Sequence, residues 1–419
     1  MSLIERDAAV IAAAQRVRFF PMAVVSATGA ILTDESGREL IDLSGGWSAA
    51  AVGYAHPRVV EAVSQAMRAM PGIGILSGTH RPGVELAERL LELIPTRSEG
   101  PRAVYLGLAG SDANTAVIRS IRAWSDRPGI LAFESSYHGG MGPSQQVSGL
   151  FTAADVPADA GLILAPYGDL EAVAVALAAG DVAAVIVEPI LSDGGLVIPA
   201  HDFLPGVRQL CDDTGTLLVV DEVKVGMGRT GRLLAHQHDG IEPDLVTLGK
   251  SLGGGLSLSA AIGPRAILNS DPGGTLLTTA GNPVACSAGL AVLDILEAER
   301  LPDRATRLGV QLESALAALE RDHDLVSSVR SRGLVGGVEL RRADGSAART
   351  ETAKIVYRAA QLGVVVYYVG TESNVLELTP PLVITQEELV SGLQIVSRAI
   401  NDVVAGRVTD QEVAAYAGW

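Results

Sequence analysis

Two residues with complementary chemistry stand at the ends of consecutive apolar runs. Asp221 follows the run 217–220, and Lys250 follows the run 245–248 and precedes the glycines 253–255. An amine can form a Schiff base with an aldehyde, and a carboxylate can keep a pyridine nitrogen protonated so that the ring absorbs carbanion electrons. The two residues are therefore candidate catalytic groups for a pyridine aldehyde cofactor.

Two further motifs complete a candidate cofactor site. Gly110 and Ser111 open a helical stretch, whose free N–H groups and positive dipole end can hold a phosphate dianion. A serine followed by an acid is also typical of an ordinary N-cap. Tyr137 offers a flat ring to lie over a cofactor, or alternatively to pack in the core. Taken with Lys250, these motifs favour pyridoxal 5'-phosphate.

Composition excludes several classes of function. With 419 residues, 48% of them hydrophobic, the chain can bury a large core in more than one domain. The net charge of −16 disfavours a nucleic-acid partner. Two cysteines, the absence of a signal segment and the lack of a spanning apolar run indicate a cytoplasmic protein without a membrane segment. The histidines show no metal-ligand spacing, so no metal site is predicted.

The middle of the chain reads as an α/β series. Uninterrupted apolar runs predict strands that are buried on both faces of a mostly parallel sheet. These runs cover 130–133, 162–164, 184–187, 217–220 and 245–248, and helical patterns cover 111–125, 169–179 and 203–213. Ligands of such sheets gather at the carboxyl ends of the strands, where Asp221 and Glu188 stand.

The pattern changes after about residue 300. Helical patterns at 302–320, 350–362 and 385–404 surround short strands near 334–340 and 364–368, which predicts a separate α+β unit. We therefore expect a large cofactor-binding domain over 47–300 and a small domain over 301–419. Residues 1–46 are expected to pack with the small domain.

Seven motifs in order resemble the class III pyridoxal-phosphate aminotransferase family. They begin at Gly110, Tyr137, Glu188, Asp221, Gly226, Gly249 and Gly281. The resemblance implies fold type I and a homodimer whose active sites are shared between subunits. It also implies pyridoxal 5'-phosphate as the cofactor.

The resemblance also assigns roles to single residues. Lys250 would form the Schiff base, and Asp221 would hold the pyridine nitrogen. The other cofactor-binding residues would be Val223 under the ring, Tyr137 over it, Gly110 and Ser111 at the phosphate, and Thr278 reaching across from the partner subunit. Glu188 is placed in the cofactor shell, although a carboxylate after a strand could equally bind neighbouring backbone amides.

Two positions depart from the aminotransferase pattern. The family usually has glutamine after Asp-Glu-Val, and this chain has Lys224. The family usually has an arginine three residues before Pro-Pro-Leu, where it grips the substrate carboxylate, and this chain has Glu377. A carboxylate at that place would repel an ordinary amino acid, so a substrate whose acid is masked as an amide fits better.

Longer stretches resemble one subgroup, the α-amino-ε-caprolactam or amino acid amide racemases. In that subgroup the lysine and aspartate that match Lys224 and Asp193 are the proton-handling pair. The same resemblance places Trp47, Leu76 and Tyr137 in the substrate pocket, beside Glu377. Without the resemblance, Lys224 could be a solvated or salt-bridged lysine and Asp193 a turn residue.

These observations lead to a ranked set of functions. Racemisation removes the α-proton from one face of an external aldimine and returns one to the other face, so two bases suit it. We therefore expect a racemase of α-amino-lactams or α-amino acid amides. The alternative is a class III aminotransferase acting on an amine or unusual amino compound with a keto acid. A third reading is a non-catalytic protein that binds the cofactor.

Overall fold

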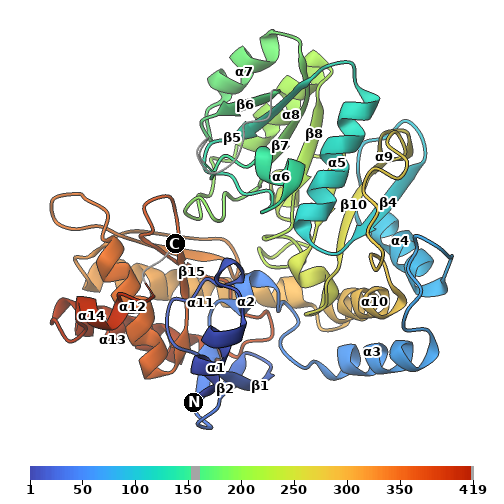
Figure 1. Ribbon diagram of the computed structural model, residues 1–419. Helices are drawn as coiled ribbons and strands as arrows, with labels where there is room; N and C mark the ends of the chain where they lie inside the picture. The colour runs from blue at the N-terminus through green and yellow to red at the C-terminus, as the bar shows by residue number, and fades with distance from the viewer. Residues whose placement is uncertain (152–160, 417–419) are drawn as a thin grey trace. The chain divides into compact units, whose positions relative to one another are not determined.

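The computed structural model describes residues 1–151 and 161–416. Contacts divide the chain into two compact units. The larger unit comprises residues 57–302, and the smaller unit combines residues 1–56 with the chain from residue 303 onward. Figure 1 labels the elements of both units.

The larger unit is built on a seven-stranded sheet in the order β4-β10-β9-β8-β7-β5-β6. Its strands are β4 (Arg102–Gly107), β5 (Gly129–Phe133), β6 (Leu162–Ala165), β7 (Val182–Val187), β8 (Leu217–Asp221), β9 (Leu245–Leu248) and β10 (Ser259–Pro264). Only β10 among these strands runs antiparallel to its two neighbours. The predicted mostly parallel sheet and its five apolar strands are confirmed.

Helices cover the sheet of the larger unit on both faces. The helices of this unit are α3 (Pro57–Ala69), α4 (Arg81–Leu93), α5 (Gly110–Trp124), α6 (Gly142–Gln146), α7 (Leu170–Ala178), α8 (Phe203–Thr214), α9 (Arg265–Leu268) and α10 (Pro283–Ala298). Two short 3₁₀ helices, η2 (Ala235–His238) and η3 (Lys250–Gly253), lie in the loops that follow β8 and β9. The three helices predicted here, α5, α7 and α8, are confirmed to within one residue at each end.

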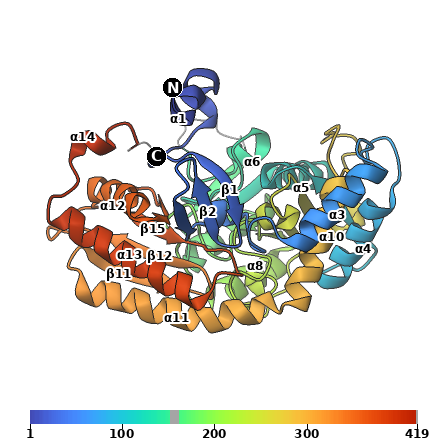
Figure 2. The same ribbon diagram turned by 90° about the horizontal axis from the view of Figure 1, so that it is seen from below.

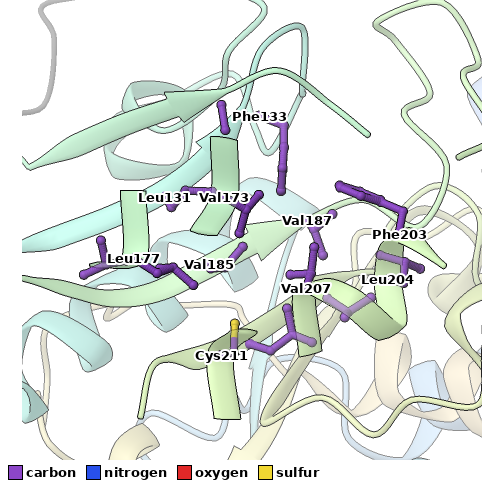
Figure 3. Close-up of a cluster of buried hydrophobic side chains, with 14 of the residues drawn as sticks. Leu131, Phe133, Val173, Leu177, Val185, Val187, Phe203, Leu204, Val207 and Cys211 are labelled. Carbon is purple, nitrogen blue, oxygen red and sulfur yellow. The ribbon is translucent and has the colours of Figure 1, made fainter. Parts of the chain in front are cut away.

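Successive residues of the central strands point to opposite faces, so each strand feeds two cores. On one face Leu131, Val185 and Val220 pack with α7 and α8 in a cluster that Figure 3 shows. On the other face Ile130 and Ile186 pack with α5 and α9. This double burial explains why the strands are uninterrupted apolar runs. Burial on both faces also holds the carboxyl ends of these strands in place, and Asp221 is the last residue of β8.

The smaller unit contains two four-stranded sheets, β1-β2-β3-β13 and β11-β12-β15-β14. The strands are β1 (Val24–Thr28), β2 (Ile31–Asp34), β3 (Glu39–Asp42), β11 (Val326–Ser331), β12 (Gly336–Leu340), β13 (Val364–Val365), β14 (Tyr367–Val369) and β15 (Val375–Leu378). β13 pairs in parallel with β3, which joins the two ends of the chain in one sheet. The run expected near 364–368 is divided at Val366 into two strands of different sheets.

Helices of the smaller unit agree with the predicted pattern. The long ones are α11 (Leu301–Asp322), α12 (Arg349–Leu362) and α13 (Gln386–Val404), and Figure 2 shows them beside β11, β12 and β15. The short ones are α1 (Leu3–Val10), η1 (Ala13–Gln15), α2 (Gly45–Ser48) and α14 (Asp410–Val413). Over the described ranges, no helix has both the length and the apolar character needed to cross a membrane.

Candidate active site

Asp221 ends β8 as a buried carboxylate with three N–H donors. Its Oδ2 accepts from Asn114 Nδ2 at 2.7 Å and from His138 Nδ1 at 2.9 Å, and its Oδ1 accepts from the backbone of Val223 at 3.0 Å. Only 4% of the residue is exposed. These donors come from α5, from the loop after β5 and from the loop after β8 itself. They hold the carboxylate in one orientation at the strand end where a ligand is expected.

Asn114 is a site residue for which the sequence analysis predicts no role. Besides its bond to Asp221, its Nδ2 donates to the backbone oxygen of His138 at 2.7 Å. The signal that could have found it is its spacing, because residue i+4 from Gly110 lies on the same face of a helix.

The N-terminus of α5 meets the loops that follow β8 and β9 at close range. A Cβ on Gly110 would stand 2.6 Å from Val223 Cγ1, and one on Gly249 would stand 3.1 Å from Gly110 N. Neither glycine can therefore carry a side chain without displacing its neighbour. Ser111 Oγ accepts from Gly140 N at 3.2 Å, which ties the first turn of α5 to the loop of Tyr137. The structure therefore brings Gly110, Ser111 and Val223 together.

Lys250 begins η3 directly after Gly249. Its φ of 39° lies in the left-handed region, which side-chain-bearing residues rarely adopt. A strained backbone of this kind persists only where the surrounding structure enforces it, and such residues are common at functional sites. The charge of Lys250 contributes to lowering the pKa of Asp193, so the two groups are electrostatic neighbours.

Lys224 and Asp193 form a buried ion pair. Lys224 Nζ lies 2.6 Å from Asp193 Oδ1, and the two side chains are 5% and 9% exposed. Burial opposes ionisation of Asp193, but the charges of Lys224 and Lys250 outweigh it and lower the pKa of the carboxyl. Lys224 is thus salt-bridged, as one alternative held, and its partner is the other member of the predicted pair. Removing both charges from water costs free energy, and the attraction between Lys224 and Asp193 must offset that cost.

Glu188 follows β7 and connects two loops of the site. Its carboxylate accepts from Tyr137 N at 3.0 Å and from Ser192 N at 3.3 Å, so it does bind neighbouring backbone amides. One of these loops carries Tyr137 and the other carries Asp193. Burial raises the pKa of Glu188 to about 7, with the charge of His138 opposing and those of Asp221 and Asp193 adding to the shift.

The raised pKa of Glu188 predicts a pH dependence of stability. The folded protein keeps a proton that the unfolded chain releases between pH 4.5 and about 7. The free energy of unfolding should therefore fall as pH rises through this window, by about 3 kcal/mol in total. Glu188→Gln should remove this contribution, as urea unfolding at pH 4.5, 5.5, 6.5 and 7.5 would show. Glu171→Gln in α7 is the exposed control, and equal pH slopes for Glu188→Gln and the wild type would contradict the shift.

The other four predicted site residues are divided between the two units. Trp47 and Glu377 belong to the smaller unit, where Trp47 stacks on Tyr367 at 4.7 Å and Glu377 is fully buried in β15. Leu76 and Thr278 belong to the larger unit and are exposed. Their segments are adjacent, because a Cβ on Gly74 would stand 2.6 Å from the backbone oxygen of Thr278.

Among the described residues, no group of three or more His, Cys, Asp or Glu side chains is placed to hold a metal ion. The histidines nearest the site have other partners. His138 contacts Asp221, and His236 Nδ1 lies 2.8 Å from Glu222 Oε1.

The fold and these residues define a pyridoxal-phosphate-dependent enzyme, and comparison with known proteins places it in a family. The model of the class III aminotransferases matches residues 12–400, so the chain belongs to that family. The predicted family and cofactor are thereby confirmed.

Individual relatives include both racemases and aminotransferases. The chain is 35% identical to a leucine/methionine racemase of Thermococcus litoralis, over 100% of this chain and 99% of the relative. It is 34% identical to an isoleucine 2-epimerase of Lentilactobacillus buchneri, over 100% and 98%. It is 32% identical to a 5-aminovalerate aminotransferase of Pseudomonas aeruginosa, over 91% and 94%.

Solved structures confirm fold type I. The ornithine aminotransferase of Toxoplasma gondii superposes with a TM-score of 0.86 at 28% identity, over 96% of this chain and 95% of that one. A Bacillus anthracis aminotransferase, at 24% identity, matches in fold with a TM-score of 0.86 over 95% and 98%.

The residues present fit pyridoxal 5'-phosphate. The cradle at Gly110 is one that a Cβ would fill, and it stands at the N-terminus of a 15-residue helix. The donor set supplies an amine at Lys250, a carboxylate at Asp221 and an aromatic ring at Tyr137. When bound, the cofactor acidifies the α-proton of an amino substrate by absorbing its electrons. Gly110 and Ser111 would hold its phosphate and Asp221 its ring nitrogen.

Proposed function

We propose that this protein racemises α-amino acid amides or α-amino-lactams by exchanging their α-proton. The buried ion pair between Lys224 and Asp193 carries the proposal. Proton exchange on both faces of one carbon needs two groups, and the larger unit holds a second amine, Lys250, whose charge reaches Asp193. The racemase and epimerase relatives, matched over the whole chain, support the same chemistry.

The individual groups have distinct parts in this proposal. Lys250 binds the cofactor and transfers a proton on one face of the substrate carbon, and Lys224 transfers a proton on the other. Asp193 holds Lys224 Nζ in place at 2.6 Å and accepts its hydrogen bond. Glu188 accepts hydrogen bonds from the loop that contains Tyr137 and from the loop that contains Asp193. It therefore positions the ring of Tyr137 and the partner of Lys224 together.

The substrate class follows from the residue that replaces the carboxylate-binding arginine. Glu377 takes the place of that arginine in the sequence, and a carboxyl group there favours a substrate whose acid is masked. A second candidate class is free apolar amino acids, because two relatives are named for leucine, methionine and isoleucine. An aminotransferase is the alternative reaction, favoured by the 5-aminovalerate aminotransferase among the relatives.

One assay separates these possibilities. A single enantiomer of leucine amide, of an α-amino-lactam and of free leucine is incubated with the enzyme in deuterated water, with and without a keto acid. We expect the amide and lactam to lose optical purity and gain α-deuterium without a keto acid, as chiral chromatography and mass spectrometry report. Retention of optical purity and of the α-proton by all three would refute racemisation, whereas turnover only with a keto acid would establish the aminotransferase.

The larger unit also supports the proposal that the protein is a homodimer. Ile73, Ile75, Leu76 and Leu276 are exposed by 42%, 42%, 44% and 63%. Three of them, Ile75, Leu76 and Leu276, line one hollow, and Thr278 follows Leu276 by two residues in the sequence. An apolar patch of this kind is typical of a subunit interface, and a second copy would cover it. Sedimentation equilibrium of the full chain tests this, and a monomer mass at micromolar concentration would contradict it.

A further inference from the structure

We propose that Asn114 is a positioning residue that selects which oxygen of Asp221 remains available to the cofactor. Its Nδ2 carries two hydrogens and has two acceptors at 2.7 Å, Asp221 Oδ2 and the backbone oxygen of His138. Both partners accept only, so the side-chain amide has one possible orientation. The inference rests on the proposed role of Asp221 toward the cofactor and is independent of racemisation.

The hydrogen bonds leave the two oxygens of Asp221 unequal. Oδ2 accepts one hydrogen bond from Asn114 and one from His138, so both lone pairs of Oδ2 are used. Oδ1 receives only the N–H of Val223 among the described residues and keeps a second acceptor site. Oδ1 is therefore the oxygen that would accept a hydrogen bond from a protonated ring nitrogen, and rotation of the carboxylate would break bonds on both oxygens.

Burial makes this arrangement specific. Asn114 is 1% exposed, and its Oδ1 has no hydrogen-bond partner among the described residues. Burying the polar side chain of Asn114 costs desolvation free energy, and its two donated hydrogen bonds must offset that cost. Asn114 lies four residues after Gly110 in α5. One side chain thus connects the helix that begins at Gly110, the loop that contains Tyr137 and the carboxylate of Asp221.

The first test uses the cofactor-loaded full chain and two substitutions of similar size, Asn114→Leu and Asn114→Asp. Asn114→Leu should release the cofactor about tenfold to a hundredfold faster, because a hydrogen bond to a charged group is lost. Asn114→Asp should release it faster still as pH rises, since two carboxylates then repel each other. Release is followed by the visible absorbance of the bound cofactor during dilution into a trap, at pH 5.5 to 8.5.

Controls distinguish positioning from packing. Thr115→Ala, at the next residue of α5, should release the cofactor at the wild-type rate. In an Asp221→Asn background, Asn114→Leu should change the rate by less than about threefold, because the two residues act through one contact. Additive effects of the two substitutions, or a wild-type release rate and pH profile in Asn114→Asp, would overturn the proposal. No substrate is present, so failure here and failure of the racemase proposal are separate results.

Discussion

Alanine at position 250 should leave the protein without covalently bound cofactor and lower its activity by at least about a thousandfold. The amine of Lys250 is the covalent handle in the proposed mechanism and also transfers a proton, so its removal eliminates both roles at once. Borohydride reduction followed by peptide mapping measures the attachment directly. In the wild type, the cofactor mass should appear on the peptide that contains Lys250.

The lysine content of the chain makes that experiment unusually clear. Lys224, Lys250 and Lys354 are the three lysines of the sequence. Lys354 pairs with Asp410 at 2.7 Å in the smaller unit, so Lys354→Ala is the matched control and should retain both attachment and activity. Cofactor found on Lys224 or Lys354 of the wild-type protein, and not on Lys250, would remove Lys250 from its proposed place.

Arginine at position 224 should keep cofactor binding but lower the rate of racemisation by about a hundredfold to ten-thousandfold. A guanidinium can retain the ion pair with Asp193, but it stays protonated and cannot act as a base. Lys224→Ala should show the same loss of rate and also leave Asp193 buried without its partner. Deuterium exchange measured separately from each enantiomer should reveal a larger loss for one enantiomer, because Lys224 serves one face of the carbon.

Comparison of these two variants separates chemistry from structure. If only Lys224→Ala is slow and Lys224→Arg reaches the wild-type rate, Lys224 acts through the ion pair and not as a base. Undiminished exchange in both variants would exclude Lys224 from the mechanism. Val175→Ala, in α7, is a control because that side chain is 71% exposed.

The sequence predicts those parts of the fold whose signal is local. The five apolar strands of the larger sheet are visible because burial on both faces demands unbroken runs such as 182–187. β10 has no such signal, since Ser-Ala-Ala-Ile-Gly-Pro combines small residues with glycine and proline, which are depleted in strands. The split at Val366 is equally invisible, because it depends on pairing β13 with the distant β3.

The candidate site is predictable as a set of residues but not as a network. Motifs identify Gly110, Asp221 and Lys250, since each contributes its own chemistry. Which group neighbours which depends on long-range contacts, such as that between Asn114 and Asp221. The pKa of Glu188 is a property of its burial at the end of β7, which no local pattern records. The left-handed backbone of Lys250 is likewise imposed by its surroundings.

The sheet that joins both ends of the chain has a consequence for synthesis on the ribosome. Ile41 of β3 pairs with Val364 of β13, so that sheet cannot be completed until almost the whole polypeptide has emerged. Residues 57–302, in contrast, contain all the strands of their own sheet and can fold while translation continues. β3 must wait for a partner strand that is made more than 300 residues later, which is the slow, non-local kind of contact. Folding of the nascent enzyme is therefore expected to begin with residues 57–302, and the pairing of β3 with β13 is expected to follow.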